Sequence, residues 1–199
     1  MKQINQEWRE QVISWLKDHV SEHRLQHILG VEMTCTKLAR LHDISPEKAS
    51  QAGLLHDLAK FFPPQKLLKL ASKAKLELDP ICLSHPHLIH ADVSAILAKT
   101  KFGISSKGIL NAISNHTLGN PKMSRLSCIV YIADSIEPNR GTDPELEKIR
   151  QLATLNLYQA TWATSDYTIG YLMRDRKVIH PRTVLTRNWA LSKSLSSKP

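Results

Sequence analysis

The sequence has few of the residues that indicate a disulfide-linked, β-rich or membrane-spanning protein. Its three cysteines, Cys35, Cys82 and Cys128, are far apart and form no C-x-x-C pair, which argues against a disulfide framework and a thiolate zinc site. Seven glycines are too few for a turn-rich β fold. No run approaches the roughly 18 apolar residues that a membrane span requires, and the N-terminal MKQINQEWREQVISWL lacks the apolar stretch of a signal peptide. We therefore expect a cytoplasmic protein with no membrane partner.

The size and charge of the chain limit its organisation and its partners. A chain of 199 residues, 42% of them hydrophobic, suffices for one core, so we expect a single helical domain over residues 1–199, with its core at about 24–190 and a polar tail at 191–199. The net charge of +9 is typical of proteins that bind nucleotides, nucleic acids or anionic membrane surfaces. Because the basic residues are scattered along the chain, a membrane surface is the least favoured of the three.

Apolar residues recur every three or four positions along most of the chain, which predicts helices. In residues 7–20 this stripe, which includes Trp8 and Trp15, packs either on its own domain or on a second subunit, and we favour the first. Ser45 and Pro46 in SPEK form a helix start signal, and we expect this helix to reach Phe61, before two prolines. The other predicted helices cover residues 25–41, 65–75, 86–100, 105–117, 122–136, 143–159, 161–173 and 181–195. Only KVIH resembles a strand, so the fold class is all-α.

The segment GLLHDLAKFF, residues 53–62, places His56 and Asp57 side by side within an apolar run. A buried carboxylate is costly unless a cation, a metal or a hydrogen-bond network offsets its desolvation. A metal is the simplest such partner. A second His-Asp pair, His42 and Asp43, lies at a predicted helix end, where such residues are solvated or cap the helix, and we assign it no catalytic function.

Four further polar residues lie in similar apolar surroundings: His27, His90, His116 and Asp134. A single histidine of this kind is more often a hydrogen-bonded core residue than a ligand. With His56 and Asp57, however, the set provides four imidazoles and two carboxylates, which suit iron, manganese, zinc or another divalent metal held between helices. Six ligands are enough for two metal ions bridged by one carboxylate. Because His85 and His87 lie close to His90, the sequence leaves open which of the three is the ligand.

The order His27, His56-Asp57, Asp134 resembles the H…HD…D signature of the HD superfamily of helical metal-dependent phosphohydrolases. Six segments in order, HILGVE, LLHDLAK, HPHLIHADVSA, ISNHTLGNPKMS, YIADSIEPNR and VIHPRTVLTRN, look like those of the YqeK-type symmetrical bis(5'-nucleosyl)-tetraphosphatases, over about residues 24–190. Ala91 and Ser94 depart from the glycines that are frequent in that family.

This resemblance implies a helical bundle of the HD-domain type that cleaves diadenosine tetraphosphate into two ADP. It also implies a centre of two divalent metal ions, usually iron. The implied metal ligands are His27, His56, Asp57, His90, His116 and Asp134.

Cationic and polar residues near these ligands are candidates for substrate contacts. Lys60 follows Asp57 by three positions, so on a helix it shares its face and can place an ammonium beside a bound phosphate. Arg140 follows the Asp134 helix and can clamp phosphate oxygens with its planar guanidinium. Both also fit an ordinary surface position. We assign catalytic roles to Asp57, Lys60 and Arg140, and substrate binding to Lys60, Arg140, Asn115 and Thr117.

Glu137 lies one helical turn beyond Asp134. It either orients a metal ligand or caps a helix, and we favour the cap.

Two alternative functions fit the same residues. The ligand set defines the reaction class better than the substrate, so an HD-type nucleotidase or phosphodiesterase that acts on another nucleotide is an alternative. A basic helical module that binds nucleic acid or protein is the alternative from a different class, and it predicts no bound metal and a steep dependence of binding on salt. That alternative leaves Asp57 and Asp134 without partners, so we favour a dinucleoside polyphosphate as the partner over nucleic acid. A homodimer stays open.

Overall fold

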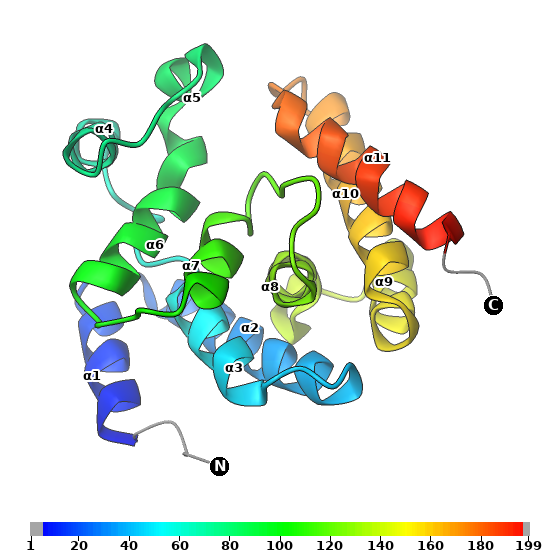
Figure 1. The fold of residues 1–199 in the computed structure, drawn as a ribbon, viewed down its shortest axis with the longest axis horizontal. Coiled ribbons are helices and arrows are strands. Elements are labelled where there is room, and N and C mark those ends of the chain that lie inside the picture. Colours follow the sequence, from blue (N-terminus) through cyan, green and yellow to red (C-terminus); the bar gives the residue numbers. More distant parts are fainter. Residues whose placement is uncertain (1–5, 197–199) are drawn as a thin grey trace.

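The computed structural model describes residues 6–196, which form eleven α-helices and two short 3-10 helices and contain no strand (Figure 1). The all-α prediction is confirmed. The elements are α1 (Gln6–Lys17), α2 (Glu22–Leu41), α3 (Pro46–Leu55), α4 (Pro64–Lys73), α5 (Pro80–Ser84), η1 (Pro86–Ile89), α6 (His90–Thr100), α7 (Lys107–Ser114), α8 (Arg125–Ile136), η2 (Pro138–Arg140), α9 (Pro144–Leu155), α10 (Leu157–Arg174) and α11 (Pro181–Ser196).

The central helix of the bundle is α8, and Figure 1 shows it between α7 on one side and the α9–α11 group on the other. Residues 126–133 of α8 are buried on every face, which is the pattern of a helix at the centre of a core. Helices α2 and α3 pack against α8 and against each other. This arrangement brings the functional segments of α2, α3, α7 and α8 close together. No helix of residues 6–196 has the length and apolar character needed to cross a membrane.

The N-terminal stripe packs on its own domain, as we favoured. Val12 and Leu16 are fully buried in the main core. The Trp8 indole donates a hydrogen bond to the carbonyl of Phe102 at 3.1 Å, and Trp15 contacts Phe102 edge to face.

Helix α3 ends at Leu55 rather than at the predicted Phe61. The imidazole Nδ1 of His56 donates to the carbonyl of Gly53 at 2.7 Å. A tight turn follows, in which the amide of Lys60 donates to the carbonyl of Asp57 at 3.1 Å. The side-chain bond at the helix end favours the turn over another helical turn, because it already satisfies a terminal carbonyl.

Other boundaries also differ from the predictions. The predicted helix 86–100 begins as η1, the predicted helix 143–159 is broken at Asn156, whose side chain caps α10, and α5 was not predicted. KVIH is not a strand. Residues 191–196 continue α11, with Ser194 buried, so most of the predicted polar tail is helical, while residues 197–199 lie outside the described residues.

Helices α2 and α3 are in close contact at Gly53. A Cβ atom at this position would lie 2.9 Å from the backbone Cα of Glu32, and backbone cannot move aside as a side chain can. The absence of a side chain at Gly53 therefore sets the spacing between the helix that carries His27 and the helix that precedes His56.

We expect Gly53→Ala to lower the free energy of unfolding by about 1–3 kcal/mol, because α2 and α3 must separate to admit the methyl group. Urea unfolding measures the change. The matched control is Gly170→Ala in α10, where nothing lies within 4 Å of the added Cβ; alanine there should raise stability by about 0.5–1 kcal/mol. Equal effects of the two substitutions would contradict the close contact.

Candidate metal centre

The six predicted metal ligands come together at the centre of the bundle, although they belong to five segments of the chain. His27 lies in α2, the His56-Asp57 pair follows α3, and Asp134 lies in α8. His90 is the first residue of α6, and His116 lies just after α7. The four imidazoles and Asp57 are buried, and Asp134 is half-buried.

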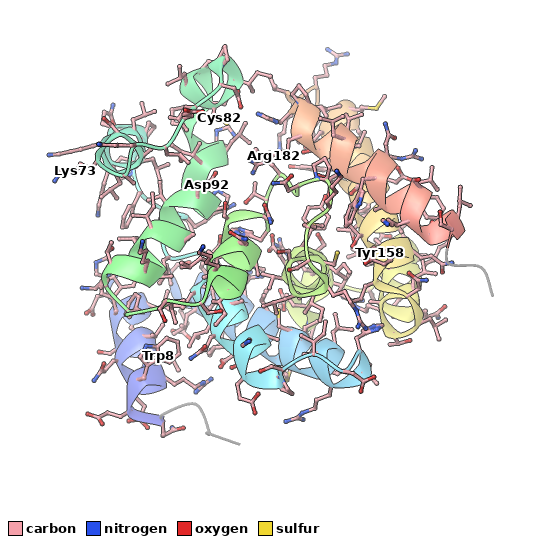
Figure 2. All side chains as sticks on the ribbon, viewed as in Figure 1. Trp8, Lys73, Cys82, Asp92, Tyr158 and Arg182 are labelled. Atoms are coloured by element: carbon pink, nitrogen blue, oxygen red, sulfur yellow. The ribbon has the colours of Figure 1, made fainter. Side chains whose placement is uncertain are left out.

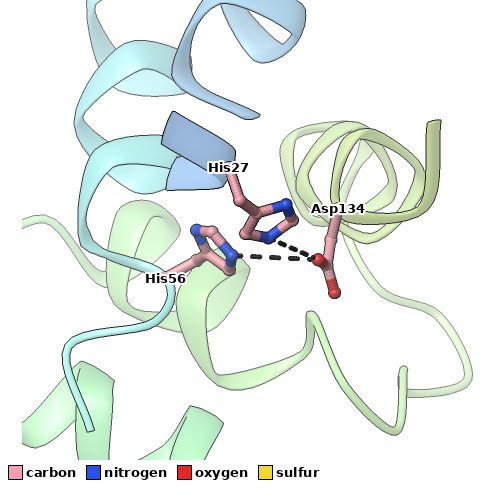
Figure 3. Close-up of side chains that lie close together, drawn as sticks. All are labelled: His27, His56 and Asp134. Carbon is pink, nitrogen blue, oxygen red and sulfur yellow. Dashed lines mark ion pairs between the residues drawn. The ribbon is translucent and has the colours of Figure 1, made fainter. Parts of the chain in front are cut away.

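Asp134 and Asp57 divide the site into two adjoining halves. In the first, Oδ1 of Asp134 lies 3.1 Å from Nε2 of His27 and 3.9 Å from Nε2 of His56, and Figure 3 shows both rings directed at this carboxylate. In the second, Oδ1 of Asp57 lies 3.3 Å from Nε2 of His90 and 3.4 Å from Nε2 of His116. The other oxygen of Asp57 lies 3.4 Å from Nε2 of His56. The Asp57 carboxylate therefore spans the two halves.

All four imidazoles use Nδ1 to hold the ring in place. His56, His90 and His116 each direct Nδ1 at the carbonyl three residues earlier, at 2.6–2.7 Å. Nδ1 of His27 instead lies 3.0 Å from Oε1 of Glu137. Because carbonyl and carboxylate oxygens only accept, the proton of each neutral ring is on Nδ1 and the lone pair of Nε2 points into the centre.

The donor atoms fit a divalent metal. Nε2 of His27, Nε2 of His56 and Oδ1 of Asp57 are buried and have no hydrogen-bond partner. Unsatisfied buried polar atoms are rare and costly in folded proteins, and imidazole nitrogens and carboxylate oxygens are typical ligands of iron, manganese and zinc. Cations bound in the two halves of the centre would satisfy these three atoms.

Burial and neighbouring charges set the protonation of the centre. Burial lowers the pKa of His90 to about 4, and the nearby Lys60 ammonium acts in the same direction, so this ring is neutral at neutral pH. Burial disfavours the ionised form of Asp57, but the neighbouring imidazoles, His56 first, outweigh burial and hold the pKa of Asp57 well below its usual range. The centre therefore offers a neutral donor at His90 and an anionic one at Asp57.

Arg24 contacts the centre and was missed by the sequence analysis. Its Nη1 donates to Oδ2 of Asp57 at 3.0 Å. Arg24 precedes His27 by one turn of α2, so the two side chains share a helix face, and this spacing is the signal that could have identified it. The guanidinium partly compensates the buried carboxylate.

Glu137 supports a metal-site histidine, in addition to the helix cap that we favoured. This buried carboxylate contacts Nδ1 of His27 through Oε1 and accepts from the amide of Asn139 through Oε2 at 2.7 Å. Gly30 makes room for it, because a Cβ at Gly30 would collide with Oε2 of Glu137. Such carboxylate–histidine pairs fix the tautomer and orientation of metal-binding rings.

Three of the four predicted substrate-contact residues touch a predicted metal ligand, and the fourth, Asn115, contacts α8 instead. Nζ of Lys60 lies 3.3 Å from Nε2 of His90, and the hydroxyl of Thr117 lies 3.1 Å from Nε2 of both His90 and His116. Arg140 donates through Nε and Nη2 to the carbonyl and the carboxylate of Asp134, at 2.8 and 2.7 Å. Asn115 instead directs its amide at Ser127 of α8, at 3.4 Å.

Among the three clustered histidines, His90 reaches the centre. His87 is exposed and contributes only its backbone carbonyl, which accepts from Nδ1 of His90. The ring of His85 lies near the hydroxyl of Ser84 instead.

A second cluster, Asp79, Cys82 and His180, joins α5 to the start of α11, and Figure 2 labels Cys82 and the adjacent Arg182. Nδ1 of His180 accepts from the amide of Arg182 at 3.1 Å, so its proton is on Nε2, which donates to Asp79 at 2.8 Å. Asp79 also caps α5 by accepting from Ile81 and Cys82. With no lone pair available on Nε2, this cluster is a structural link between two segments.

Comparisons with known proteins agree with this geometry. The family model described as HD domain matches residues 24–139. The chain belongs to the HD domain family. The "Bis(5'-nucleosyl)-tetraphosphatase, symmetrical" of Bacillus subtilis (strain 168) is 36% identical over 187 residues, which cover 94% of this chain and 99% of that protein. A protein of the same description from Halalkalibacterium halodurans is also 36% identical, and the match covers 92% of this HD-domain chain and 97% of that protein.

A solved structure shares the fold of this HD-domain protein. It is described as the crystal structure of a predicted HD superfamily hydrolase involved in NAD metabolism, from Clostridium acetobutylicum. The two chains are 35% identical, the match covers 92% of this chain and 97% of that one, and the TM-score is 0.88. The HD-type bundle and the resemblance to the symmetrical tetraphosphatases are therefore confirmed, and HD-domain membership implies that the centre binds a divalent metal.

We expect Glu137→Ala to weaken metal binding by about 10- to 100-fold, because the His27 ring loses the carboxylate that orients it. Metal titration followed by elemental analysis measures the affinity. Glu137→Gln should retain more of it, since the amide oxygen still accepts from Nδ1. An affinity of the alanine variant equal to that of the wild type would contradict this role of Glu137.

Proposed function

We propose that this HD-domain protein is a metal-dependent hydrolase that cleaves diadenosine tetraphosphate symmetrically into two ADP. The convergence of four imidazole Nε2 atoms and two carboxylates in one largely buried site carries the proposal. The identity of the substrate is inferred from the relatives in B. subtilis and H. halodurans. Their names state this activity, and they match nearly the whole chain.

In this proposal the six ligands would hold two divalent ions. His27, His56 and Asp134 would hold the first, and His90 and His116 would hold the second. The two oxygens of Asp57 face different histidines, so this carboxylate would contribute to both. Iron is our choice on the family resemblance, and manganese or another transition metal suits the same donors. Such ions, when bound, polarise phosphoryl oxygens and lower the pKa of water.

The surrounding side chains hold and orient the reacting groups. Lys60 directs its ammonium at the His90 side of the centre, where it offsets negative charge on the phosphoryl oxygens. Thr117 places its hydroxyl between the two rings nearest this side and binds a phosphate oxygen. Arg140 orients Asp134 through two of its nitrogens and offers the third, Nη1, to the substrate. For Asn115, a substrate contact stays a prediction.

The reaction is a single hydrolytic substitution. The oxygen of water bonds to one of the two central phosphorus atoms, and the P–O bond of the bridge between those atoms breaks. The bridging oxygen leaves as part of one ADP, the water oxygen becomes part of the other, and the water protons pass to solvent or to the products. The buried position of the site strengthens each charge contact with the phosphate chain.

The direct test is to incubate the metal-loaded protein with diadenosine tetraphosphate and to separate the products by chromatography. We expect two ADP per substrate and complete loss of the reaction after chelation. ATP and AMP as products would contradict symmetrical cleavage. Release of phosphate from a nucleoside monophosphate, or opening of another phosphodiester, without cleavage of diadenosine tetraphosphate would favour the alternative HD-type substrates.

The two His-Asp pairs of the chain provide a matched test of the site. We expect Asp57→Asn to lower kcat/KM and the metal affinity by at least about 100-fold, because the anionic ligand between the two halves is lost. Asp43→Asn makes the same chemical change at an exposed residue with a φ of 51°, a conformation that asparagine tolerates, and should leave both quantities unchanged. Normal metal content and turnover of the Asp57 variant would exclude the proposed centre.

A further inference from the structure

The turn after α3 presents a phenyl ring to solvent beside the metal centre. Phe61 is 54% exposed, although a ring of this size would normally gain from burial. Its neighbour Phe62 is half-buried against the smaller core cluster of α4 and α6, with Nζ of Lys66 3.4 Å from its ring centroid. Of these two adjacent phenylalanines, one therefore stabilises the fold and the other is left in water.

Arg24 connects the exposed ring to the centre. Its Cζ lies 5.7 Å from the centroid of Phe61, while its Nη1 donates to Asp57 at 3.0 Å. The ring is thus separated from the central carboxylate by a single guanidinium group. Because Phe61 remains 54% exposed beside Arg24, its ring is accessible to a ligand.

Among the large apolar side chains that are exposed within residues 6–196, the aromatic ones are Phe61 and Tyr171. Tyr171 lies on α10, where its ring contacts the cations of Arg174 and Lys177, and it contacts no residue of the centre.

We propose that Phe61 is the platform on which a nucleobase of the substrate stacks while the adjoining phosphates occupy the metal centre. This inference rests on the proposed function and deepens it by naming how the base is held. Every base presents a π-face, so stacking of this kind discriminates little between bases. We therefore expect ADP and GDP to bind with similar affinity.

The test is calorimetric titration of the metal-loaded protein with ADP and, separately, with inorganic pyrophosphate. Phe61→Ala should weaken ADP binding by about 5- to 100-fold, the range expected for loss of one stacked base, and should leave pyrophosphate binding unchanged. Phe61→Trp should retain ADP affinity, because it keeps an aromatic face. Tyr171→Ala is the matched control and should bind both ligands as the wild type does.

Two results would overturn the proposal. Equal weakening of ADP and pyrophosphate would assign Phe61 to the support of Arg24 and Asp57, and unchanged binding of both would place the base elsewhere. Because binding is measured without turnover, failure to cleave diadenosine tetraphosphate contradicts the proposed function alone. A loss of affinity confined to ADP would still support the stacking platform.

Discussion

The structure of this protein depends on a buried, ionised carboxylate, that of Asp57. A buried negative charge is strongly destabilising unless hydrogen-bond donors or cations contact its oxygens. Arg24 compensates one oxygen directly, and imidazoles from three different segments surround the carboxylate. The bundle must therefore close on this point with its helices at defined spacings, and the missing side chains at Gly30 and Gly53 are part of that requirement.

Interruptions of helical structure, rather than helix interiors, present most of the ligands. His56 and His116 follow helix ends, and His90 marks the passage from a 3-10 helix to an α-helix. In each case Nδ1 of the ring donates to the carbonyl three residues earlier, close to the helix end. One local bond thus fixes the ring tautomer and directs the free nitrogen inward.

The sequence predicted the fold class and the convergent residues because both depend on local patterns. A three- to four-residue apolar period specifies helices, and a carboxylate within an apolar run signals a partner, as it did at Asp57 and Asp134. The sequence did not predict the end of α3 at Leu55, because the deciding bond of His56 is a side-chain contact. It missed Arg24, and it predicted the cap of Glu137 without its contact to His27, because the partners of these two residues lie 33 and 110 positions away in the chain. The sequence likewise could not select His90 over His85 and His87, because the direction of each ring depends on how the backbone passes from η1 into α6.

The ligands of the centre are distributed over five segments, from His27 in α2 to Asp134 in α8. Such a constellation cannot exist in an unfolded chain, so any ion with affinity for it binds the native state preferentially. Metal supply and resistance to unfolding are thereby linked thermodynamically. When a cell withdraws the metal, both the activity and the folded fraction of the protein would fall. The rate at which proteases degrade the protein would then depend on the metal concentration in the cell.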